Sequence, residues 1–201
     1  MSANIVDTIM KIVKNFLKSE DRTTLMAWVD QSINDNLFFQ GPPDRYILRL
    51  KQQFPSGWGN RDITDGKMRL ETNSAKYDLI IPSCIGEIEG QIIDKYELPK
   101  ECDCFISYHV KGGHINPHIH HPEPGYCDLR FNIFVNKTEG GDPVCDGKQE
   151  EVRSCDLTIF SSNKKHHSTP VKCGRRIVLS YGFYIQEDVA LKICSKKRIL
   201  L

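Results

Sequence analysis

Five of the seven histidines lie in two short clusters, at residues 116–121 and 165–170. In an extended strand alternate side chains share a face, so His118 and His120 can point the same way while Ile119 packs on the other side. A third imidazole from a distant strand, His166 or His167, would complete a facial set of ligands and leave coordination positions open for a substrate or dioxygen. The two clusters together predict a metal centre that carries out chemistry.

The spacing around the second cluster adds specificity, because a single His-x-His pair is common in surface loops. Gly140-Gly141 precedes the cluster, and Pro170-Val171, Gly174 and Arg176 follow it. His166 lies four residues before Pro170 and ten before Arg176.

With these features the chain resembles the 2-oxoglutarate and iron(II)-dependent dioxygenase superfamily, and within it the prolyl 4-hydroxylase-like branch. Members of that branch carry a His-x-Asp pair, a Gly-Gly turn and a distal histidine. Pro-Val follows this histidine, and a glycine then leads to a basic residue ten positions after it. The resemblance covers roughly residues 104–185 and implies that His118, His120 and His166 are the metal ligands.

One feature departs from the family pattern. His120 stands where the family has a carboxylate ligand, so the metal would meet three neutral imidazoles and the site would carry one more unit of positive charge. A nearby acid such as Glu123 or Asp128 could supply the missing carboxylate. Otherwise the site works with three histidines, or it is inactive or repurposed.

The resemblance implies iron(II) as the metal, 2-oxoglutarate as co-substrate and dioxygen as oxidant. Arg176 would pair with the far carboxylate of 2-oxoglutarate, because a guanidinium matches a carboxylate bidentately in a dry site. Tyr108 would place its hydroxyl against the same carboxylate, and Arg130 and Asn132 are weaker candidates for the wall of the site. The implied reaction hydroxylates a carbon of a protein or amino-acid side chain, with decarboxylation of 2-oxoglutarate to succinate.

Two other functions fit parts of the pattern. A cupin-like three-histidine dioxygenase would use the His-x-His pair without 2-oxoglutarate, although Pro170-Val171 and Arg176 would have no role in it. A non-catalytic jelly-roll module would hold a structural metal or none. Structural zinc would prefer a fourth protein ligand, which His114, His121 or Cys127 could provide.

The elements that must position these residues change in kind near residue 101. Before it, apolar spacing predicts helices over about residues 5–17, 25–33, 43–54 and 82–96. After it, alternation predicts strands over 104–110, 128–136, 157–160, 176–185 and 189–193, with a hairpin turn at Asp146-Gly147. We therefore expect an α+β, mainly β fold: a double-stranded β-helix, or jelly roll, at 101–201, buttressed by N-terminal helices within 1–100 in a single compact domain.

Composition narrows the class further. A net charge of +1 gives no support for nucleic-acid binding, and no apolar run approaches the roughly 18 residues of a membrane span. No signal-peptide pattern opens the chain, so we expect a cytoplasmic protein with a protein or small-molecule substrate and eight reduced, mostly structural cysteines. Trp58 is expected to pin a loop to the body of the protein.

Overall fold

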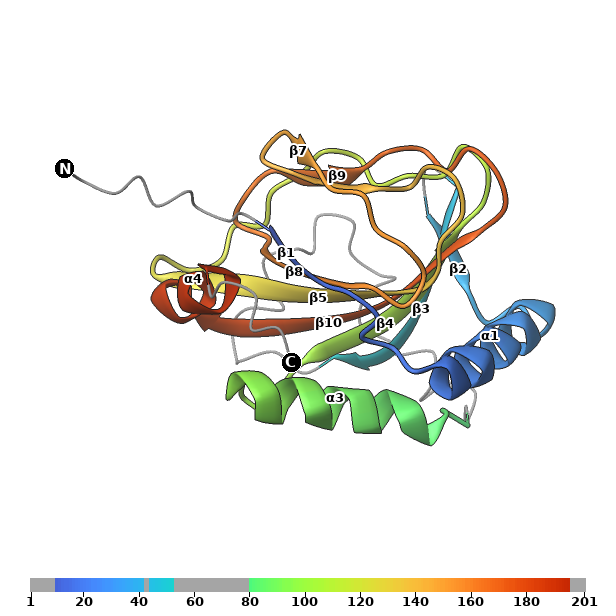
Figure 1. Ribbon diagram of the computed structural model, residues 1–201, viewed down its shortest axis with the longest axis horizontal. Helices are drawn as coiled ribbons and strands as arrows, with labels where there is room; N and C mark the ends of the chain where they lie inside the picture. Colours follow the sequence, from blue (N-terminus) through green and yellow to red (C-terminus); the bar gives the residue numbers. More distant parts are fainter. Residues whose placement is uncertain (1–9, 42–43, 53–79, 196–201) are drawn as a thin grey trace.

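The computed structural model describes residues 10–41, 44–52 and 80–195, and within these ranges the chain forms two antiparallel sheets and three helices (Figure 1). The seven-stranded major sheet has the order β1 (Met10–Val13), β8 (Leu157–Ser161), β5 (Tyr126–Asn136), β10 (Arg176–Gln186), β4 (Asp103–His109), β3 (Arg45–Gln52) and β2 (Phe39–Gly41). The three-stranded minor sheet has the order β7 (Lys148–Gln149), β6 (Pro143–Cys145) and β9 (His166–Ser168).

The helices cover one face of the major sheet, and the minor sheet lies over the other. Figure 1 shows α1 (Ser19–Asn34) and α3 (Ser83–Tyr96) below the major sheet, with α4 (Glu187–Ser195) at one end of β5 and β10. The fold is therefore the expected mainly β jelly roll with helices against one sheet.

The two faces of the major sheet differ sharply in chemistry. On β5, Leu129, Phe131 and Ile133 belong to the main apolar core with the helices. The alternate residues Asp128 and Arg130 point to the other side, toward the minor sheet, and are polar yet buried. A buried polar face needs partners or a ligand, because an unpaired polar group out of water is costly. The inner face, by which we mean the side of the major sheet toward the minor sheet, is therefore where a functional site is expected.

Several predicted elements are confirmed. The helices predicted over 25–33 and 82–96 correspond to α1 and α3, and the strands predicted over 104–110, 128–136, 157–160 and 176–185 correspond to β4, β5, β8 and β10. The Asp146-Gly147 turn joins β6 to β7, with positive φ at both residues as a tight hairpin turn requires.

Three predictions of secondary structure are wrong. Residues 10–13 form edge strand β1, paired with β8, where a helix over 5–17 was predicted; residues 1–9 lie outside the described ranges. Residues 45–52 form strand β3 between β2 and β4, where a helix over 43–54 was predicted. In both segments hydrogen bonding to a neighbouring strand outweighs a short apolar spacing that fits either structure.

The third error runs the other way. The predicted strand at 189–193 lies in helix α4, which buries Ala190, Ile193 and Cys194 at helical spacing. Glu187 and Asp188 stand in its first turn, where negative charge is favourable.

The remaining expectations concern single residues and segments. All eight cysteines are free, and Trp58 lies outside the described residues. Among the described residues, no helix has both the length and the apolar character needed to cross a membrane.

Candidate metal centre and the inner face

His118 and His166 face each other because their backbones pair directly. The His118 amide donates to the His166 carbonyl at 3.1 Å, and the His166 amide donates back at 3.0 Å. The next alternate amide on that segment, that of His120, donates to the carbonyl of Ser162 at 3.0 Å. An extended segment beside β9 thus carries two of the histidines, and β9 carries the third.

The three imidazoles form a compact group. Ring centroids are 4.1 Å apart for His118 and His166, and 5.2 Å apart for His120 and each of the other two. One nitrogen from each ring lies within 4.8 Å of the others, which is close enough for one ion to reach all three. His167, the neighbour of His166, follows on the strand and pairs with Val144, so its side chain takes the opposite face.

Hydrogen bonds fix which ring nitrogen is free. His118 Nδ1 lies 2.8 Å from the Asn116 carbonyl, and His166 Nδ1 lies 2.9 Å from the Lys164 carbonyl. His120 Nδ1 lies 2.8 Å from Oδ2 of Asp128. Each acceptor requires a proton on Nδ1, which leaves the Nε2 lone pair to bind a metal. The donor set therefore fits a divalent transition metal such as iron(II).

Burial favours the neutral form of two of the candidate ligands, His118 and His166. His166 is 8 % exposed, and burial, followed by the neighbouring imidazoles, lowers its pKa to about 3. Burial also lowers the pKa of His118. Phe160 on β8 packs against the His166 ring at 5.2 Å and helps to hold it. Neutral imidazoles bind metals, so these two histidines need no deprotonation near pH 7.

The same burial predicts how the stability of the metal-free protein depends on pH. His109, which is fully buried, has its pKa lowered to about 2, so neither it nor His166 takes up a proton in the folded state at pH 5. The unfolded chain does so below about pH 6.5. The free energy of unfolding should therefore fall on acidification below about pH 6.5, by about 1.4 kcal/mol per pH unit for each such histidine. Urea unfolding of wild type and His109→Gln from pH 7 to 4.5 measures this, and an unchanged slope in the variant would contradict it.

No carboxylate joins the ligand group in the described part of the chain. Glu123 is exposed, and only the three histidines converge. Asp128 is fully buried and touches His120 on the nitrogen that faces away from the metal position. Of the alternatives considered from sequence, the arrangement of the described residues is the one that three-histidine ligation would need, with Asp128 hydrogen-bonded to His120.

Arg176 begins β10 on the inner face and is only 2 % exposed. Its Nε and Nη1 have no hydrogen-bond partner among the described residues, and its guanidinium lies 5.3 Å from the ring centroid of Phe134. Burial, and then the charge of Arg45, lower the pKa of Arg176 to about 9. Gly141 leaves room for this side chain, since an added Cβ would lie 2.8 Å from Arg176 Cδ. Such an arginine calls for an anion.

Two neighbours that the sequence did not single out also have buried polar atoms without hydrogen-bond partners among the described residues. Arg45 on β3 and His109 on β4 are paired in register with each other and with Arg176, so the three form one row across the sheet. The Nε of Arg45 and both ring nitrogens of His109 are buried without partners in the described part of the chain. Strand parity could have indicated His109, the residue after Tyr108, but Arg45 lay in a segment predicted as a helix.

Tyr108 does not lie where its predicted role in binding the co-substrate requires. It pairs with Ile177 in register and packs in the core on the helix side, stacked on Tyr46 at 4.5 Å. Because adjacent residues of a strand face opposite ways, Tyr108 points away from the face that holds Arg176. The expected contact between its hydroxyl and the co-substrate is not compatible with this position.

Arg130 and Asn132 both lie on the inner face of β5. Arg130 Nε binds Asp128 at 2.7 Å and its Nη1 binds Asp103 at 2.8 Å, so this guanidinium already has two carboxylate partners. Asn132 pairs in register with Thr158 on β8 and with Ser180 on β10. The hydroxyls of Thr158 and Ser180 are buried without partners in the described ranges. Along β10 this row meets the strand at Ser180, between Arg176 and Gly182, and Gly182 is the residue that pairs with Arg130.

Solved structures with a similar fold include prolyl hydroxylases and a 2-oxoglutarate–iron(II) oxygenase. A Pseudomonas putida prolyl-4-hydroxylase matches at 13 % identity, with a TM-score of 0.56 over 87 % of this chain and 91 % of that one. A Trichoplax adhaerens prolyl hydroxylase, in complex with a hypoxia-inducible-factor peptide, matches at 15 % identity and a TM-score of 0.56 over 95 % and 88 %. At this identity the likeness shows a shared fold.

A third similar structure is the collagen prolyl hydroxylase of Paramecium bursaria chlorella virus 1, in complex with 2-oxoglutarate. It matches at 12 % identity and a TM-score of 0.54, over 89 % of this chain and 97 % of that one. No protein-family model and no curated protein matches the chain.

Proposed function

We propose that this protein is a 2-oxoglutarate- and iron(II)-dependent oxygenase that hydroxylates a carbon of a protein or amino-acid side chain. His118, His120 and His166 would hold the iron, and Arg176 would bind the far carboxylate of 2-oxoglutarate. The fold that the chain shares with solved 2-oxoglutarate oxygenases supports the assignment.

Two features together carry this proposal: a group of histidines that could bind a cation, and a buried arginine that lacks an anion. Three imidazoles present free Nε2 atoms for a cation, and a buried arginine with unmet N–H groups requires an anion. An oxoacid that chelates a metal and ends in a second carboxylate meets both. The polar row of Asn132, Thr158 and Ser180 lies between the two ends in the register of the strands.

When bound, iron(II) supplies the activation of dioxygen: 2-oxoglutarate is oxidised to succinate and carbon dioxide, and one oxygen atom enters a C–H bond of the substrate. The chain itself supplies position and a dry environment. Arg176 would orient the co-substrate through a charged hydrogen-bonded pair with its far carboxylate. Phe134 beside Arg176 and Phe160 beside His166 exclude water from the two ends.

Anaerobic titration tests the proposal directly. Metal-free protein should bind iron(II), and added 2-oxoglutarate should then produce the weak visible charge-transfer band of the iron chelate. Succinate, which lacks the 2-oxo group, should produce no band. Protein that binds iron(II) but gives no band at millimolar 2-oxoglutarate would contradict the proposal.

The proposed substrate is a protein or amino-acid side chain. One similar structure is a prolyl hydroxylase bound to a peptide, which supports a protein side chain as substrate here. Succinate release can be measured with prolyl peptides, other peptides, free amino acids and nucleosides. We expect turnover with a peptide or amino acid, and turnover with nucleosides alone would contradict the substrate assignment.

A cupin-like three-histidine dioxygenase is the second candidate, because the ligand group contains three imidazoles and no carboxylate among the described residues. Such an enzyme would oxidise a thiol or diketone without 2-oxoglutarate. Oxygen uptake with a thiol or diketone substrate, together with a missing chelate band, would favour it. It gives no role to the buried charge of Arg176.

A further inference from the structure

His120 differs from the other two histidines in what supports it. The Nδ1 atoms of His118 and His166 meet backbone carbonyls, whereas that of His120 meets the carboxylate of Asp128 at 2.8 Å. Asp128 is fully buried on the inner face of β5. A carboxylate on the outer nitrogen of a metal-binding histidine fixes the ring and makes it a stronger donor.

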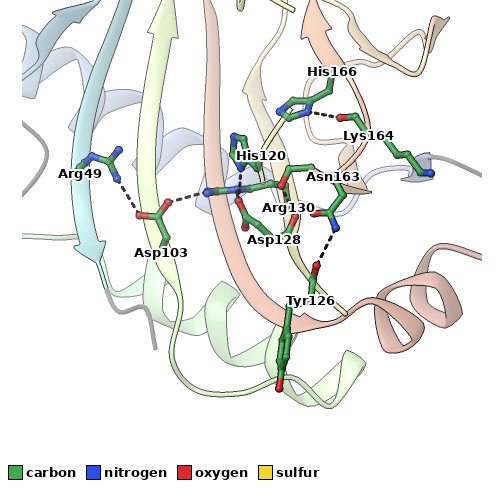
Figure 2. Close-up of polar contacts among 10 residues, drawn as sticks. Arg49, Asp103, His120, Tyr126, Asp128, Arg130, Asn163, Lys164 and His166 are labelled. Carbon is green, nitrogen blue, oxygen red and sulfur yellow. Dashed lines mark hydrogen bonds and ion pairs between the residues drawn. The ribbon is translucent and has the colours of Figure 1, made fainter. Parts of the chain in front are cut away.

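Asp128 is held by a chain of alternating charges (Figure 2), which runs from β5 over β10 to β4 and β3. Arg130 Nε donates to Asp128 Oδ2 at 2.7 Å, and its Nη1 donates to Asp103 Oδ2 at 2.8 Å. Arg49 on β3 then binds Asp103 Oδ1 at 3.2 Å. The four side chains carry two positive and two negative charges, so the network is neutral by itself and needs no charge from a metal.

Gly182 on β10 makes room for this network. A Cβ at Gly182 would lie 2.6 Å from Arg130 Cζ, 2.7 Å from Arg130 Nη1 and 2.9 Å from Asp128 Oδ1. These distances are shorter than non-bonded contacts permit, so the Arg130–Asp128 pair lies directly against the β10 backbone. The glycine is needed here for space, because a side chain at this position would displace the pair from the position in which it meets His120.

We propose that Asp128 is the carboxylate of this metal centre, and that it acts by accepting a hydrogen bond from the ligand His120 and not by binding the metal. The inference rests on metal binding by the proposed triad. A carboxylate ligand would place its negative charge directly on the metal. Asp128 instead places its negative charge beside His120, through the hydrogen bond from Nδ1. Asp128 is a positioning residue. Arg130 binds it, Asp103 binds Arg130, and Gly182 leaves room for the Arg130–Asp128 pair.

A double-mutant cycle read out by cobalt(II) binding tests this role. The dissociation constant and visible d–d spectrum of cobalt(II) are measured for wild type, Asp128→Asn, His120→Asp and the double variant. With His120 in place, Asp128→Asn should weaken cobalt(II) binding by about 10- to 100-fold and shift the spectrum. In the His120→Asp background, where no imidazole donates to residue 128, the same change should cost less than about 3-fold.

The control is Asp156→Asn, which removes another buried aspartate that has a cation partner, Lys14 at 2.8 Å. It should leave the cobalt(II) dissociation constant unchanged. If Asp128→Asn does not fold without metal, Gly182→Ala replaces it, because this change keeps every charge and only displaces the pair. Weaker cobalt(II) binding in Gly182→Ala supports the proposal, and unchanged binding overturns it.

The outcomes separate this inference from the proposed function. An equal loss on Asp128→Asn in both backgrounds, or no loss in either, overturns the role of Asp128 while leaving the oxygenase proposal intact. Wild-type protein that binds neither cobalt(II) nor iron(II) overturns both. Wild type that binds metal but does not respond to 2-oxoglutarate overturns only the oxygenase proposal.

Discussion

Replacing His166 by alanine will lower the affinity for iron(II) by more than about 100-fold, beyond the loss that outer-shell changes cause at metal sites. Two imidazoles would remain, and His118 would lose the ring that lies 4.1 Å from its own. The chelate band with 2-oxoglutarate should disappear with the metal. Anaerobic titration with iron(II), followed by visible spectroscopy, measures both effects.

His167→Ala is the matched control. It removes the same side chain one position along β9, on the opposite face of the strand. Iron(II) affinity and the chelate band should stay as in wild type. Loss of iron on His167→Ala with retention on His166→Ala would show that the register of the ligand strand is wrong.

Replacing Arg176 by methionine should separate stability from co-substrate binding. Affinity for 2-oxoglutarate should fall by about 100-fold, because truncating one partner of a buried charge pair costs several kcal/mol. The protein without 2-oxoglutarate should be at least as stable as wild type, because an apolar side chain replaces a buried guanidinium whose Nε and Nη1 are unpaired. Asp142, which partly offsets the charge of Arg176, keeps its partner Lys137 at 3.1 Å.

Thermal unfolding with and without 2-oxoglutarate, in the presence of iron(II) under argon, reports both quantities. Wild type should gain stability from the ligand, whereas Arg176→Met should gain little. Arg175→Met is the control, because Arg175 lies on the helix side over the Tyr108 ring and is paired with Asp30. If the ligand-induced rise in unfolding temperature is lost in Arg175→Met and kept in Arg176→Met, the anion site lies on the helix side of the sheet and the prediction is wrong.

The outcome for secondary structure follows from where each element finds its partners. The helix α3 was predictable because Ile85, Ile88 and Ile92 repeat at helical spacing and all three are buried. Strand β3 was not, because Ile47 and Leu50 are three residues apart, which fits a helix, whereas the strand buries Leu48 and Leu50. Its pairing with β4 decided the matter, and such pairing joins residues about sixty positions apart.

The same distinction applies to single residues of the site. Counting from Pro170 and Arg176 selected His166 over His167, and the strand geometry of β9 brings His166 beside His118. Spacing along the chain did not reveal that Tyr108 lies on the helix side of the sheet and His109 on the inner face. Alternation divides the residues of a strand between two faces, but it does not show which element packs on each face.

The sequence by itself predicted the candidate ligand residues. Three histidines, and an arginine ten positions after the last, stand at a spacing that resembles that of the 2-oxoglutarate oxygenases, and this spacing can be seen in the sequence because strand alternation and chain order are local properties. Only the tertiary structure decided the charge around them. Asp128 supports His120, and Arg45 and His109 join Arg176, because these contacts depend on how β3, β4, β5 and β10 align. Long-range register is set by the packing of the whole sheet, which no local spacing encodes.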